Sequence, residues 1–189
     1  LLATQPRIIC ELGSGASTVI FALFLKQNGK ATEKRLISVD HEAQWLSRTQ
    51  ELVRQFGVSE LVTLQFAPCR EQRLALDSEC GAGAAQEGVW DGKEEIDRVL
   101  GPYRRQVQLL FVDGPPRDFG RFPAMAVLEP YLIPSAKVLL DDVGRPEEYR
   151  ILRDWQVLFH DAVAATCLCP VGNGLGFLQM KPRSGRRGC

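Results

Sequence analysis

The stretch that decides the fold is Arg7-Ile8-Ile9-Cys10-Glu11-Leu12-Gly13-Ser14-Gly15-Ala16-Ser17-Thr18. Its first half, residues 7–12, is a short apolar run of the kind that forms a strand buried on both faces. Two glycines follow, and the segment over residues 17–27 predicts a helix. Glycines let the backbone turn tightly and let a ligand approach the chain, and a helix N-terminus favours electronegative groups. The stretch predicts a strand, a turn and a helix. The turn is either a ligand site or a plain connection.

The alternation of strand and helix patterns continues along the chain. The expected strands are residues 35–39, 61–66, 107–112 and 137–140, and the expected helices are residues 42–56, 94–100, 122–132 and 146–159. Two more apolar segments, residues 162–169 and 176–180, flank a Gly172-Asn173-Gly174 turn and predict a hairpin. Residues 70–93 break the pattern with several glycines and alanines, so we expect a loop or an insertion there. The whole pattern predicts a mostly parallel sheet covered by helices.

Length and composition exclude several classes of protein. The chain has 189 residues, of which 45% are hydrophobic and 24% charged, as in an ordinary globular domain. Lys plus Arg and Asp plus Glu number 23 each, so the net charge is zero and a nucleic-acid partner is not expected. The longest apolar run, residues 19–25, is too short to span a membrane. We expect one domain over residues 1–181 and a disordered tail over residues 182–189.

The cysteines indicate the compartment. None of the six lies in a Cys-x-x-Cys pair, and no histidine is placed to complete a zinc site. No signal peptide is visible at the start, so we expect a reducing, cytoplasmic environment. The chain begins at Leu1 rather than Met, and we expect that an upstream segment has been lost.

Polar residues at strand ends are the first candidates for a site, because ligands bind beyond the carboxyl ends of the strands in open α/β sheets. The second strand is followed by Asp40-His41-Glu42. Asp40 lies about 25 residues after the glycine pair, a spacing that suits hydrogen bonds to ribose hydroxyls. His41 either lies against an adenine ring or is a surface histidine without a role. Glu42 is expected to be a first-turn acid of the next helix.

Two enzyme classes share a glycine turn followed by a strand-end acid. Nicotinamide dehydrogenases prefer a third glycine where this chain has Thr18. Methyltransferases that use S-adenosylmethionine prefer an acid two residues before the first glycine, and Glu11 is that acid. The sequence therefore resembles a class I S-adenosylmethionine-dependent methyltransferase.

The resemblance extends over nearly the whole chain, from about residue 8 to residue 180. It is carried by Val112-Asp113-Gly114-Pro115-Pro116, by Arg121-Phe122-Pro123-Ala124 and by Leu140-Asp141-Asp142-Val143-Gly144-Arg145, which are similar to a group of small bacterial-type methyltransferases. The resemblance implies a Rossmann-like three-layer sandwich with a mostly parallel seven-stranded sheet and a C-terminal antiparallel hairpin.

The resemblance also implies a set of site residues. The expected cofactor-binding residues are Glu11, Gly13, Ser14, Gly15, Ser17, Asp40, His41 and Asp113. In the family, residues at the positions of Glu11, Gly13 and Gly15 shape the methionine pocket, the acid at Asp40 holds the ribose, and the acid at Asp113 lies near the methionine amino group or the acceptor. We expect Asp113 to be catalytic. Two features depart from the family pattern: Ala67-Pro68-Cys69 stands where many members carry an acid after the third strand, and only seven residues precede Ile8, where members often have helices that help to cap the substrate.

Three carboxylates form a candidate metal site. Asp113 follows the fourth strand, and Asp141 and Asp142 follow the fifth, so neighbouring parallel strands bring them to one edge of the sheet. Oxygen ligands alone suit Mg²⁺ or Ca²⁺, and the set resembles the Asp, Asp-Asn ligands of metal-dependent O-methyltransferases. Alternatively, Asp141 or Asp142 caps the next helix or pairs with Arg145.

The nearby arginines have two interpretations as well. Arg117, Arg121 and Arg145 follow strand ends and suit an anionic acceptor, while Arg121 equally suits a surface ion pair. Trp45 and Trp155 are expected to face the core or its margin. The sequence predicts methyl transfer from S-adenosylmethionine to a small-molecule acceptor, at an oxygen and with possible help from Mg²⁺. The alternatives are a non-catalytic binding module with a methyltransferase fold and an NAD(P)-dependent oxidoreductase.

Overall fold

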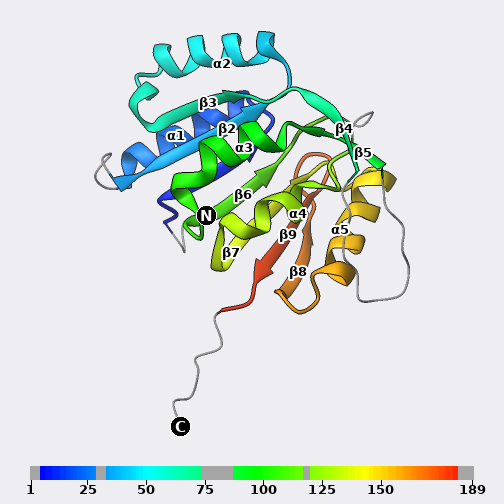
Figure 1. The fold of residues 1–189 in the computed structure, drawn as a ribbon. Helices are drawn as coiled ribbons and strands as arrows, with labels where there is room; N and C mark the ends of the chain where they lie inside the picture. The colour runs from blue at the N-terminus through cyan, green and yellow to red at the C-terminus, as the bar shows by residue number, and fades with distance from the viewer. Residues whose placement is uncertain (1–4, 29–32, 74–86, 117–119, 183–189) are drawn as a thin grey trace.

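The computed structural model describes residues 5–28, 33–73, 87–116 and 120–182 (Figure 1). Within these residues, seven strands form one sheet in the order β3-β2-β1-β6-β7-β9-β8. Their bounds are β1 Ile8–Leu12, β2 Arg35–Asp40, β3 Val62–Phe66, β6 Val107–Val112, β7 Leu132–Asp141, β8 Val163–Cys169 and β9 Leu175–Met180. Neighbouring strands among β1, β2, β3, β6 and β7 pair in parallel, whereas β9 runs antiparallel to both β7 and β8. The predicted fold class is confirmed.

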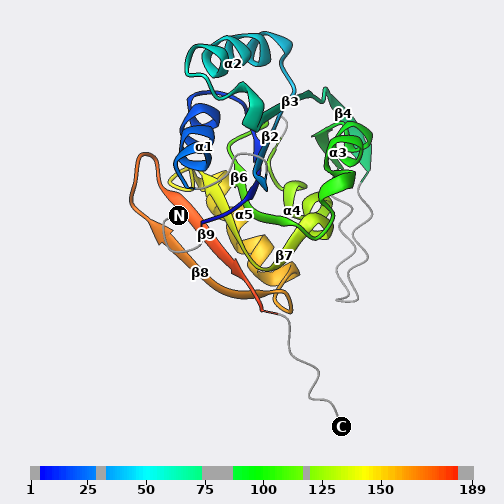
Figure 2. The ribbon, with the colours of Figure 1, turned by 90° about the vertical axis from the view of Figure 1, so that its left-hand side faces the viewer.

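Helices cover both faces of the sheet, and Figure 2 shows α1 and α3 on opposite sides of it. The helices are α1 Ala16–Gln27, α2 Ala43–Gln55, α3 Lys93–Leu100, α4 Ala124–Leu128 and α5 Pro146–Leu158, with 3₁₀ turns η2 Ser59–Leu61, η3 Gly101–Tyr103 and η4 Glu129–Tyr131. Because side chains alternate along a strand, Ile9 packs with α1 and α2 on one face and Cys10 packs with α3, α4 and α5 on the other. The central strands are therefore apolar throughout, as the sequence indicates.

The helix expected at residues 122–132 is shorter than predicted. Only α4, five residues long, is α-helical, and η4 follows it directly. Pro130 lies inside η4 and has no N–H group to donate to an i−4 carbonyl, so the α-helix does not continue. The chain is then free to start β7 at Leu132, five residues before the predicted strand.

The loop expected at residues 70–93 contains two strands that the sequence pattern did not predict. These are β4 (Cys69–Arg73) and β5 (Glu87–Asp91), which pair antiparallel. Pairing of two antiparallel strands satisfies the hydrogen-bonding groups of both backbones, whatever side chains the strands carry. Two such strands therefore need show no hydrophobic periodicity in the sequence. The residues between the two strands lie outside the described part of the chain.

The other predicted elements agree with the structure to within two residues at each end, including the C-terminal hairpin. The tail expected after residue 181 falls almost entirely outside the described residues. Among the helices that are described, none has the length and apolar character needed to cross a membrane. The parallel strands β1, β2, β6 and β7 end at the same edge of the sheet, and this edge carries the candidate site.

Candidate active site

The turn after β1 packs directly against the turn after β6. Gly13 has φ +95°, a conformation that L side chains rarely adopt, and its N–H donates to the carbonyl of Val39 at 2.8 Å. A Cβ atom at Gly13 would lie 3.0 Å from the carbonyl carbon of Asp113 and from the nitrogen of Gly114. Both the backbone angle and the close approach of the two turns therefore require glycine here.

Glu11 lies beneath this turn and is fully buried. Its Oε2 accepts hydrogen bonds from the hydroxyls of Thr18 at 2.5 Å and Ser38 at 2.7 Å, and Thr18 Oγ1 accepts one from the N–H of Gly15 at 2.9 Å. Its Oε1 is buried without a hydrogen-bond partner among the described residues. Burial raises the pKa of Glu11 to about 7. Glu11 thus ties β1, α1 and β2 together below the site.

Asp40, at the end of β2, is only 5% exposed and holds two turns in place. Its Oδ2 accepts a hydrogen bond from the N–H of Ser14 at 2.7 Å, and its Oδ1 accepts one from the N–H of Glu42 at 2.8 Å. His41 lies beside it, with Nδ1 3.3 Å from Asp40 Oδ1. A carboxylate has about four acceptor positions, so Asp40 keeps capacity for ligand hydroxyls.

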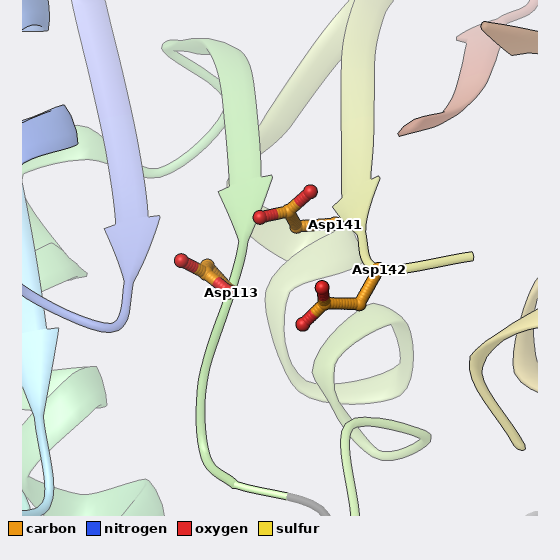
Figure 3. A group of neighbouring side chains, drawn as sticks. All are labelled: Asp113, Asp141 and Asp142. Carbon is orange, nitrogen blue, oxygen red and sulfur yellow. The ribbon is translucent and has the colours of Figure 1, made fainter. Parts of the chain in front are cut away.

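Three carboxylates meet where β6 and β7 end (Figure 3). One oxygen each of Asp113, Asp141 and Asp142 lies within 4.8 Å of the others, which confirms the predicted proximity. Burial raises the pKa of Asp113 to about 6, and the neighbouring Asp141 and Asp142 add to the rise while Arg121 opposes it. Asp113 is therefore a stronger base than an ordinary aspartate.

Arg121 lies within this cluster and is 4% exposed. Its Nη2 is 3.1 Å from Asp113 Oδ1 and 3.3 Å from Asp142 Oδ2. Arg121 therefore forms ion pairs, as one of its two interpretations predicted. The predicted location on the surface is wrong, because Arg121 is buried.

Asp142 has two further partners. Its Oδ2 lies 2.8 Å from Nη1 of Arg145, and its Oδ1 accepts a hydrogen bond from Asn173 Nδ2 at 3.1 Å. The predicted pairing with Arg145 is confirmed. The N-cap of α5 is Arg145 and carries no side-chain cap bond, so the predicted aspartate cap is wrong.

The donor set of the cluster decides whether a divalent cation fits it. Arg121 already bridges Asp113 and Asp142, and both oxygens of Asp142 are engaged by hydrogen-bond donors. A cation shared by all three carboxylates would have to displace a buried guanidinium. As the side chains lie, the set does not fit a cation held by all three.

These turns line an open cavity of about 630 Å³. It is lined by Gly13, Ser14, Gly15, Ala16, Ser17, Asp40, His41, Glu42, Trp45, Phe111, Asp113, Gly114, Pro116, Arg121, Asp141, Asp142 and Arg145. The cavity therefore lies at the carboxyl ends of the parallel strands, where the sequence predicts ligand binding.

A comparison with protein families identifies the fold that carries this cavity. A family model described as "Methyltransferase domain" matches residues 10–143, well over half of the chain. The chain belongs to the methyltransferase domain family. No curated protein matches this chain in sequence.

Solved structures resemble the methyltransferase domain in fold. A methyltransferase from Geobacter sulfurreducens superposes with a TM-score of 0.60 at 14% identity, over 95% of this chain and 75% of that one. The SAH-bound methyltransferase PaMTH1 from Podospora anserina gives 0.59 at 15% identity, over 95% and 74%. The O-methyltransferase TomG from Streptomyces achromogenes, involved in tomaymycin synthesis and in complex with SAM, gives 0.57 at 16% identity, over 94% and 74%.

The methyltransferase domain brings nearly all of the predicted site residues together. Of the eight predicted cofactor-binding residues, all except Glu11 line the cavity. Glu11 acts from below, through Thr18 and Ser38. Arg117 lies outside the described residues. Ala67, the first residue of the stretch after the third strand, is fully buried and does not line the cavity.

Trp45 lines the site, although the sequence pattern did not indicate a role for it there. Trp155 is fully buried as expected, but Trp45 is 46% exposed and lines the cavity, so its prediction as a residue of the core or its margin is wrong. The guanidinium of Arg48 lies 5.1 Å from the centre of its ring. The position of Trp45 in the sequence could have indicated that it lines the site. It is in the first turn of α2, directly after Asp40-His41-Glu42, and helical side chains point back toward the helix N-terminus.

Proposed function

We propose that the methyltransferase domain transfers a methyl group from S-adenosylmethionine to an oxygen of a small-molecule acceptor. The observation that carries the proposal is the single cavity wall that joins the glycine turn, Asp40 and Asp113. Two structural relatives bind this cofactor or its demethylated product, and one is an O-methyltransferase, which supports the same chemistry here.

The cavity wall suggests how the cofactor lies. We assign its methionine part to the turn at Gly13 and Gly15, where the N-terminal N–H groups of α1 favour a carboxylate. We assign the ribose hydroxyls to Asp40, whose oxygens keep acceptor capacity. Trp45 and His41 offer flat surfaces for the adenine.

In the reaction, a lone pair of the acceptor oxygen attacks the methyl carbon while the carbon–sulfur bond breaks and its electrons return to sulfur. The protein mainly positions the two reactants in a dry cavity. Asp113 accepts the hydroxyl proton, a role suited to a carboxylate whose pKa is raised to about 6 by burial. No step uses a metal. The Mg²⁺ predicted at Asp113, Asp141 and Asp142 stays a prediction, and the position of Arg121 speaks against it.

A calorimetric titration with S-adenosylmethionine tests the cofactor assignment. We expect one-to-one binding by the wild type and binding at least about 100-fold weaker by Asp40→Ala, because two hydrogen bonds to a charged group contribute about 1.5–3 kcal/mol each. Glu51→Ala, on the exposed side of α2 and away from the cavity, is the matched control and should bind as the wild type does. Unchanged affinity in Asp40→Ala would remove the ribose assignment. Saturable binding without turnover over a broad acceptor panel would instead favour a non-catalytic module.

A further inference from the structure

We propose that Arg121 is a built-in cation of the active site, which holds Asp113 and Asp142 in the place where a divalent metal would otherwise bind. In this role Arg121 is a positioning residue, because it acts through the two aspartates. The proposal concerns the site of the proposed methyl transfer, but its test measures cation binding and requires no turnover.

The contacts of Arg121 join its own segment to two others, residues 113–115 and residues 141–142. Its Nη2 donates to the main-chain carbonyl of Asp113 at 2.9 Å and contacts the carboxylates of Asp113 and Asp142. Its Nη1 donates to the carbonyl of Asp141 at 3.0 Å, and its Nε donates to the carbonyl of Pro115 at 3.3 Å. One guanidinium therefore fastens the ends of β6 and β7 and the segment after β6, as a metal ion with several oxygen ligands would.

The charge balance of the cluster requires such a cation. Carboxylates that share a partly buried site repel one another, and one of them keeps its proton unless positive charge is close by. Arg121 is almost fully buried, so its positive charge is little screened by water. Arg145 contacts only Asp142 among these acids, and its side chain is 45% exposed. Arg121 is therefore the main fixed charge between the strands.

Arg121 also restrains the side chain of Asp113. Arg121 contacts both the main-chain oxygen and the side-chain Oδ1 of this residue, which restrains the rotation of the carboxylate at the cavity wall. A metal could do the same only in competition with the guanidinium, since both need the same oxygens.

Two variants separate the charge of Arg121 from its shape. Arg121→Gln keeps hydrogen-bond donors but has no charge, whereas Arg121→Lys keeps the charge and loses the planar fork. Binding of Mn²⁺, a paramagnetic stand-in for Mg²⁺, is measured by electron paramagnetic resonance. We expect no stoichiometric Mn²⁺ binding by the wild type or Arg121→Lys. We expect Arg121→Gln to bind one Mn²⁺ per chain at least about tenfold more tightly, a difference of about 1.4 kcal/mol.

Thermal unfolding gives a second readout. The melting temperature of the wild type should be equal in chelator and in millimolar Ca²⁺, while that of Arg121→Gln should fall in chelator and recover in Ca²⁺. If Arg121→Gln is unfolded in chelator, recovery of its melting transition in Ca²⁺ is the expected result. Tight Mn²⁺ binding by the wild type, or an Arg121→Gln variant that neither binds Mn²⁺ nor recovers in Ca²⁺, would overturn the proposal. A failed S-adenosylmethionine titration with these cation results intact would count against the proposed function alone.

Discussion

At the scale of single residues, Gly13 shows how tightly the site is built. It has φ +95°, and an added Cβ would meet the backbone of Asp113 and Gly114 at 3.0 Å. Gly172 also has a positive φ, +58°, but nothing lies within 4 Å of its missing side chain. A substitution at Gly172 therefore meets backbone strain alone, whereas a substitution at Gly13 meets both backbone strain and the close approach of two turns.

We expect Gly13→Ala to lower the free energy of unfolding by roughly 2 kcal/mol more than Gly172→Ala, since only Gly13 carries both costs. Urea denaturation of the two variants and the wild type measures the difference. Equal losses would mean that the turns after β1 and β6 can move apart without cost.

The protonation of Asp113 sets the expected pH dependence. Its pKa is raised to about 6 by burial, and a base must be ionised to accept a proton. Methyl transfer should therefore rise with pH through about 6 and level off above 7. Asp113→Asn should be about 100-fold slower or worse on this plateau, and the difference should shrink below pH 6, where the wild-type carboxyl is protonated. Titration of the carboxyl carbon by NMR checks the pKa without an acceptor. A midpoint at the value of an ordinary aspartate would contradict the assignment of Asp113 as the base.

The placement of single residues could be predicted from the sequence where it follows from position along one strand and the turn after it. Asp40 and Asp113 are strand-end acids, and the topology alone brings them to one cavity. The burial of Arg121 depends on oxygens from two segments, residues 113–115 and residues 141–142, and the exposure of Trp45 depends on how the first turn of α2 meets the rim of the cavity. Such features arise from packing between segments, which a pattern along the chain does not contain.

At the scale of elements, Trp155 is the largest side chain that α5 buries in the core, where Leu152 packs as well. Trp155 is fully buried, and its Nε1 donates to the carbonyl of Phe122 at 2.8 Å, just before α4. Val157, two residues further along α5, is 69% exposed. The pair offers a matched test of how α5 docks.

Trp155→Ala should cost about 3–5 kcal/mol of folding free energy because it opens a large cavity. Trp155→Phe keeps most of the apolar contact and should cost less, although it leaves the carbonyl of Phe122 without its donor. Val157→Ala should change stability by less than about 0.5 kcal/mol. Chemical denaturation monitored by circular dichroism ranks the three. A small loss in Trp155→Ala would show that α5 is held by other contacts.

Elements with a strong hydrophobic period were predictable, and those set by local exceptions were not. The five parallel strands follow from apolar runs, and α2 follows from one apolar stripe. The early end of α4 depends on Pro130, and β4 and β5 depend on pairing with each other. The period of a sequence reports which face is buried, so it is silent where pairing partners or one missing N–H decide the structure.

At the scale of the whole molecule, the proposed cofactor should stabilise the fold. A ligand that binds only the folded chain at 100 times its Kd adds about 2.7 kcal/mol. For a domain of this length, that corresponds to a rise in Tm of roughly 5–10 °C. We expect this rise with S-adenosylmethionine and none with NADH, measured by differential scanning fluorimetry. A rise with NADH alone would favour the oxidoreductase alternative.

The turn between β8 and β9 contacts the acidic cluster and is synthesised after it. Asn173 in this turn binds the carboxylate of Asp142, and the N–H groups of Val143 and Gly144 donate to the carbonyls of Gly174 and Asn173. The ribosome makes all the acids of the cavity before it makes this turn. A nascent chain that already carries the glycine turn, Asp40 and the three clustered aspartates still lacks Asn173, the hydrogen-bond partner of Asp142 Oδ1. The chain should therefore become able to bind the proposed cofactor late in translation, when β9 pairs with β7.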